Sequence, residues 1–72
     1  MTFTEQLRQI KRLHELIKRK ATGSPKQLAD RMNISRATAF RRVEDLKDLG
    51  AEIAYCRDRQ SYYYELPFEL VL

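Results

Sequence analysis

Cysteine and histidine are scarce in this sequence, which holds only Cys56 and His14. A lone cysteine can form no disulfide within the chain, and one cysteine with one histidine cannot supply the four ligands of a structural zinc site. There are only two glycines, Gly23 and Gly50, and no glycine-rich loop that would cradle a phosphate. We therefore expect neither a metal ion nor a cofactor.

Long apolar runs are also absent. No stretch approaches the roughly 20 residues that a membrane span requires, and the first residues lack the basic segment and apolar stretch of a secretory signal. We expect no membrane association and, as the default, a cytoplasmic location. No pair of carboxylates, no nucleophile with its base and no cofactor motif stands out, so we expect no enzyme activity.

The chain of 72 residues is long enough for one small domain. A chain of this size buries only about 60 % of the surface that its unfolded form exposes, so its core is thin. Its charge is uneven: residues 1–42 hold eleven lysines and arginines against three acidic residues, whereas residues 43–72 hold three against seven. This asymmetry favours one surface that binds a polyanion and another that does not.

Apolar spacing predicts a first helix from Phe3 to about Arg19 or Lys20, with Thr2 and Glu5 forming a capping box at its start. The expected apolar stripe comprises Phe3, Leu7, Ile10, Leu13, His14 and Ile17. We interpret His14 as a histidine at the edge of the core, because it adjoins this stripe.

Two more helices follow. Ser24 and Pro25 suit the N-cap and the first position of a second helix, and Asn33 is expected to end it because asparagine tolerates left-handed backbone. Ser35 caps a third helix that extends to about Leu49. Only about three residues separate these two helices, which is the helix-turn-helix pattern.

Beyond Gly50, expected just past the end of the third helix, the pattern changes from helical to alternating. The residues of the two expected strands are Ile53 and Tyr55, then Tyr62, Tyr64 and Leu66. The polar segment 57–61 between them predicts a hairpin loop. The fold class is therefore α+β: a three-helix bundle with a helix-turn-helix, followed by a two-stranded antiparallel β-hairpin. We place this domain at residues 1–66 and an apolar C-terminal tail at residues 67–72.

The order of these elements resembles the winged helix-turn-helix of bacterial transcription regulators, in the variety found at the N-terminus of the DeoR and WYL-domain groups. The resemblance covers roughly residues 6–66. The residues that carry it are Ser24, Pro25, Leu28, Ala29, Met32, Asn33, Ile34, Ser35, Arg36, Thr38, Val43, Leu46, Gly50 and Ile53. It implies a DNA-binding transcription regulator in which the hairpin is the wing.

The third helix, about residues 36–49, is expected to enter the major groove of double-stranded DNA. If Ala39 and Val43 are buried, the opposite side of the helix is free to meet base edges. We expect Arg36 and Arg41 to bind guanine. Either Phe40 or the methyl group of Ala37 is expected to pack on a thymine methyl. The full set of expected DNA-binding residues is Ser24, Ser35, Arg36, Ala37, Thr38, Phe40, Arg41, Arg57 and Arg59.

Ser24 and Ser35 lie at helix N-termini, where backbone N–H groups favour phosphate, and Arg57 and Arg59 resemble wing residues that reach a minor groove or the flanking backbone. Structural alternatives stay open for both pairs. The serines act as helix caps in any case, and the loop is equally well a solvated turn in which Asp58 bridges the arginines.

Phe40 is equally well a core residue beside the first helix, and Arg42 lies nearer the core edge, where it pairs with an acid or a phosphate. The alternative function is a protein–protein interaction module without direct DNA reading. Because one small module offers a small DNA interface, we predict a homodimer. The candidate surfaces are the acidic C-terminal half and the apolar tail, with exposed parts of the first helix as a further candidate. The tail alternatively packs on the first helix as a third core layer. A larger regulatory protein is a further candidate partner.

Overall fold

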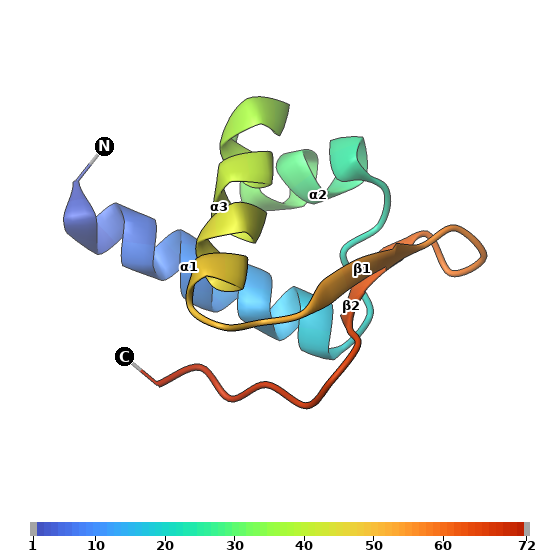
Figure 1. Ribbon diagram of the computed structural model, residues 1–72. Helices are drawn as coiled ribbons and strands as arrows, with labels where there is room; N and C mark the ends of the chain where they lie inside the picture. The colour runs from blue at the N-terminus through green and yellow to red at the C-terminus, as the bar shows by residue number, and fades with distance from the viewer. Residues whose placement is uncertain (1, 72) are drawn as a thin grey trace.

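The computed structural model describes residues 2–71 and consists of three helices followed by a two-stranded antiparallel sheet (Figure 1). The elements are α1 (Phe3–Lys18), α2 (Pro25–Met32), α3 (Arg36–Asp48), β1 (Ile53–Cys56) and β2 (Ser61–Tyr64). This arrangement confirms the expected α+β, winged-helix-like fold class. Met1 of the expected domain and Leu72 of the expected tail lie outside the described residues.

Side-chain caps fix where each helix begins. Thr2, Ser24 and Ser35 each accept a hydrogen bond from the backbone N–H three residues further on, at 3.1 to 3.2 Å. At Ser24 the capping box is complete, because Gln27 Oε1 accepts the Ser24 N–H at 2.9 Å. These bonds satisfy N–H groups that have no partner within the helix. The expected starts of all three helices are confirmed.

The turn between α2 and α3 depends on a left-handed residue. Asn33 has a φ of 55° and ends α2, as its side-chain type predicts. Ile34 then packs against the core from within the turn. After α3 the chain turns at Gly50, which has a φ of 106°, a backbone conformation that glycine adopts without strain. The helix-turn-helix geometry therefore rests on local signals in the sequence.

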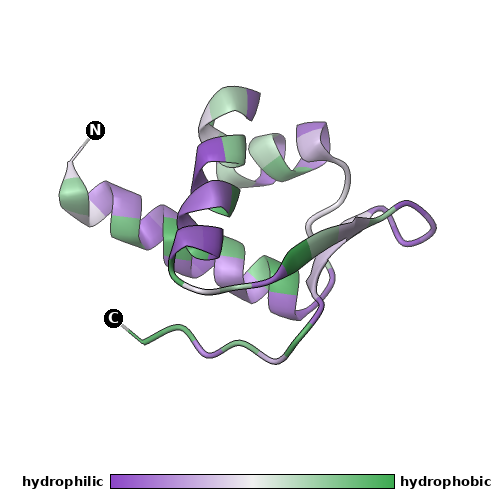
Figure 2. Ribbon diagram, viewed as in Figure 1, coloured by the Kyte–Doolittle hydropathy of each residue, from purple (hydrophilic) through white to green (hydrophobic). Residues whose placement is uncertain are grey.

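The core lies where the three helices meet. Its buried apolar residues are Ile10, Leu13, Leu16, Ile17, Leu28, Ala29, Ala39, Val43, Leu46 and Ala51. Figure 2 shows apolar segments recurring between polar ones along α1. Phe3 does not join this stripe: it is 74 % exposed, because the first turn of α1 extends past the part of the helix that α3 covers (Figure 1). The expectation for Phe3 is therefore wrong.

The hairpin is anchored to the helices through the segment between α1 and α2. Thr22, which is fully buried, accepts the Tyr62 N–H at 2.9 Å, and its own N–H donates to Ser61 Oγ at 3.2 Å. Ser61 is 1 % exposed and pairs with Cys56 at the end of the ladder. The loop therefore comprises residues 57–60, and the prediction that it includes Ser61 is wrong. The Ser61 hydroxyl is buried because it bonds to Thr22.

The inward face of the hairpin carries aromatic residues. Tyr55 and Tyr62 are paired across the strands with ring centroids 5.1 Å apart, and Tyr62 and Tyr64 pack against the core. Leu66 was expected in the second strand, but it follows the end of β2 and is 58 % exposed. The aromatic rings join the wing to the helical bundle.

His14 is buried at the edge of the core, as expected, with its Nδ1 2.7 Å from the Tyr64 hydroxyl. Burial first, and then the negative charge of Glu15, raises the pKa of Tyr64 to about 12. Phe68 of the tail packs on both rings, and Leu70 also packs on the core. The tail thus runs back along α1 (Figure 1). For Phe68 and Leu70 this is the expected alternative in which the tail packs on the first helix.

Candidate nucleic-acid interface

The outward side of α3 carries two arginines. Ala39 and Val43 are 3 % and 2 % exposed, so they fix which side of α3 faces the core. Arg36 and Arg41 are exposed, and neither takes part in an ion pair with another residue of the range 2–71. Their guanidinium groups are therefore available to an external anion. Of the other expected contacts on this helix, Ala37 is exposed and Thr38 is half-buried.

Phe40 is 61 % exposed and does not tuck beside α1. The core alternative for this residue is wrong, because its position on α3 faces α2 and the hairpin rather than α1. There it lines a groove. The residues that line this groove are Pro25, Leu28, Arg36, Ala39, Phe40 and Tyr62. An apolar ring thus lies beside Arg36 on this exposed side of α3.

Arg42 has a different environment from the other arginines of α3. It is 7 % exposed, and its Nη1 lies 3.1 Å from Asp45 Oδ2. Asp45 also accepts a hydrogen bond from Gln6 Nε2 of α1 at 3.3 Å. The expected pairing of Arg42 with an acid is thus present, and it lies at the junction of α1 and α3.

The two serines cap helices, and this role is visible in the structure. Ser24 Oγ accepts from Gln27 N, while Ser35 Oγ accepts from Thr38 N and donates to Thr38 Oγ1 at 2.9 Å. Both serines retain some exposure. A phosphate contact at these N-termini stays a prediction.

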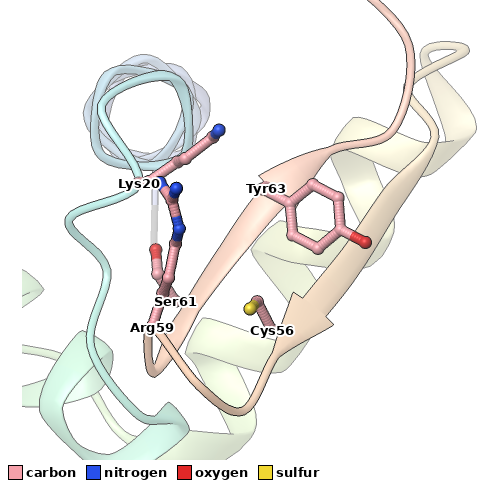
Figure 3. Close-up of a pocket in the computed structure, with 5 residues that line it drawn as sticks. All are labelled: Lys20, Cys56, Arg59, Ser61 and Tyr63. Carbon is pink, nitrogen blue, oxygen red and sulfur yellow. The ribbon is translucent and has the colours of Figure 1, made fainter.

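The hairpin loop presents Arg57 and Arg59, both exposed. Within the described residues, no ion pair joins either arginine to Asp58, so the bridged turn is not the arrangement seen here. In Figure 3 the side chain of Arg59 lies close to that of Lys20, from the end of α1. The two cations border a pocket that Cys56 and other hairpin residues also line.

Lys20 and Tyr62 were not expected at this surface. Lys20 is separated from the hairpin by two helices in sequence, and the buried contact of Thr22 with β2 helps to hold it there. Tyr62 was expected in the second strand; it packs on the core and also borders the groove beside Phe40. No local pattern indicates either placement, because both arise from contacts between distant segments.

Other kinds of site find little support among the described residues. No group of three metal-ligating side chains occurs within residues 2–71. None of the helices in that range combines the length and the apolar character that crossing a bilayer demands.

A family model described as a helix-turn-helix (HTH) domain matches residues 8–63. The match spans most of the chain, which therefore belongs to the HTH domain family. Membership of this family indicates a DNA-binding regulator. Searches of curated proteins and of solved structures give no match.

Proposed function

We propose that this HTH domain regulates transcription by binding double-stranded DNA with α3 in the major groove. The observation that carries the proposal is the exposure of Arg36 and Arg41 on a helix that α1 and α2 hold in place. An α-helix fits the major groove, and arginine pairs bidentately with guanine O6 and N7. A rigid support favours such contacts, because little side-chain and backbone freedom is lost on binding.

The charges along α3 indicate which end enters the groove. Its acidic residues lie in the C-terminal half, where Glu44 lies 3.4 Å from Lys47 and Asp45 lies 3.1 Å from Arg42. The N-terminal half carries arginines and no acidic residue. Phosphate repels the acidic C-terminal half of α3 and attracts the N-terminal half. We therefore place the N-terminal turns of α3 against the base edges. Ala37 and Thr38 lie in the same turns and are proposed to contact bases or sugars.

Neighbouring elements supply the proposed contacts to the DNA backbone. Ser24 and Ser35 begin helices whose N-terminal N–H groups favour phosphate. Arg57 and Arg59 are proposed to contact the flanking backbone or minor groove, and Lys20 adds a charge beside Arg59 (Figure 3). Neutralising phosphates releases the counterions condensed on DNA, and this release is less favourable when the salt concentration is high. Affinity should therefore fall steeply with ionic strength.

The proposal is tested with the double variant Arg36→Ala/Arg41→Ala and a matched pair from α1, Arg8→Ala/Arg12→Ala. Both pairs are exposed and remove the same charge. A duplex is first selected from a random library with the intact protein, and affinities are then measured by fluorescence anisotropy at low and moderate salt. A bidentate contact is worth about 1–3 kcal/mol, so losing both arginines should weaken binding by about 30-fold or more. The α1 pair should weaken it much less.

Equal losses for the two pairs would show that α3 does not read the bases. A library without any enriched sequence, and no duplex affinity at low salt, would refute DNA binding. The selection also tests the proposed homodimer, since two copies related by a two-fold axis select a palindromic site. Sedimentation of the protein with the selected duplex then gives the number of bound chains.

A further inference from the structure

We infer that Phe40 is a specificity-determining residue that reads the C5 methyl group of thymine, which rests on the proposed binding of α3 in the major groove. Phe40 is 61 % exposed although phenylalanine is usually buried. The inward positions of α3 are filled by Ala39, Val43 and Leu46, so the core makes no demand on residue 40. Its ring is presented to whatever α3 binds.

The chemistry of the ring limits what it can recognise. Phenylalanine has no hydrogen-bond donor or acceptor, and therefore cannot read the polar groups on base edges. The C5 methyl of thymine is the apolar group that the major groove presents. Covering that methyl removes apolar surface of both partners from water, which favours the contact. A ring in this place consequently discriminates thymine from cytosine.

The position of Arg36 predicts how far the thymine read by Phe40 lies from a guanine bound by Arg36. Arg36 precedes Phe40 by one helical turn, and both border the same groove beside Pro25 and Tyr62. Four residues of helix advance by about 6 Å, and adjacent base pairs are about 3.4 Å apart. With Arg36 on guanine, the thymine read by Phe40 lies about two base-pair steps away in the same half-site.

Deoxyuridine provides the decisive probe, because it keeps the hydrogen-bonding groups of thymidine and lacks only the methyl. The selected duplex is prepared with each thymidine replaced in turn by deoxyuridine, and affinities are measured for the intact protein and for Phe40→Ala. The intact protein should bind about fourfold more weakly at one thymine of each half-site, as expected for one buried methyl. Phe40→Ala should bind the thymine duplex about as weakly and lose the preference at that position.

Two further variants separate reading from folding. Phe3→Ala removes another exposed ring, which lies on α1 and outside the proposed interface, and should keep the full preference. Phe40→Leu keeps an apolar side chain and should keep part of it, and thermal unfolding of each variant shows whether the groove has lost support. Binding without any thymine–uracil difference, or a preference that survives in Phe40→Ala, would overturn the role of Phe40 alone. Absence of duplex binding by the intact protein would instead overturn the proposed function.

Discussion

Replacing Thr22 by valine tests whether buried hydrogen bonds hold the wing against the helices. Thr22 is 0 % exposed and Ser61 is 1 % exposed. Thr22 Oγ1 accepts the Tyr62 N–H at 2.9 Å and lies 3.2 Å from Ser61 Oγ, which in turn accepts the Thr22 N–H. This group of bonds joins the segment between α1 and α2 to the free edge of β2, and so positions the loop that carries Arg59.

The loss of stability in Thr22→Val follows from the Tyr62 N–H, which loses its acceptor. Valine keeps the branched shape of threonine without the hydroxyl, so the Tyr62 N–H is left without its acceptor. Such a loss costs about 1–3 kcal/mol, out of about 4–11 kcal/mol expected for a domain of this length. The melting temperature should fall by about 4–8 °C for each kcal/mol. Thr4→Val changes an exposed threonine on α1 and should alter the free energy of unfolding by less than about 0.5 kcal/mol.

Urea and thermal unfolding, followed by circular dichroism, measure these changes. Ser61→Ala and the double variant complete a mutant cycle, in which the two residues should show a coupling of at least about 0.5 kcal/mol because they share one network. Unchanged stability of Thr22→Val, or a double variant that is strictly additive, would refute the view that this network anchors the hairpin.

Three other predictions concern the frame that supports the interface. Asn33→Ala should lower the free energy of unfolding by about 1 kcal/mol because residue 33 has a φ of 55°, whereas Asn33→Gly should be nearly neutral in the same urea titration. Tyr64, whose pKa burial and then Glu15 raise from 10.0 to about 12, keeps its proton longer in the folded state, so stability should hold below pH 10 and fall between pH 10 and about 12. Unfolding measured across that window should show a smaller fall for Tyr64→Phe. Asp45→Ala should destabilise more than Arg42→Met, because it leaves a cation whose side chain is 8 % exposed without its partner.

Local chemistry accounts for what could be predicted. Four residues act within a few positions of themselves and are found where the sequence predicts them. They are the helix caps Ser24 and Ser35, the left-handed Asn33, and Gly50 just after α3. The change of apolar period after Gly50 likewise predicts the two strands. These signals fix the helix-turn-helix because its geometry is set by residues close together in the chain.

Contacts between distant segments account for what could not be predicted. Periodicity continues through Phe3, but a residue is buried only where a neighbouring element covers it, and Phe3 is left exposed. The burial of Ser61 depends on Thr22, far away in the sequence. The proximity of Lys20 to Arg59 follows from the same contact (Figure 3). Alternation and spacing carry no information about such partners.

The central part of α3 departs from the pattern that stability alone would favour. Along residues 40–43 the aromatic Phe40 is exposed and the cationic Arg42 is buried, whereas a helix evolved only for packing would have the reverse. The ion pair with Asp45 compensates the burial of Arg42 in part, since Arg42 Nε has no hydrogen-bond partner among residues 2–71, and nothing in the fold compensates the exposure of Phe40. Conflicts between local preference and global structure concentrate at functional surfaces, where binding replaces folding as the demand on a side chain. The uncompensated residue is therefore the stronger indication of contact with a partner, and its place beside Arg36 puts that contact on α3.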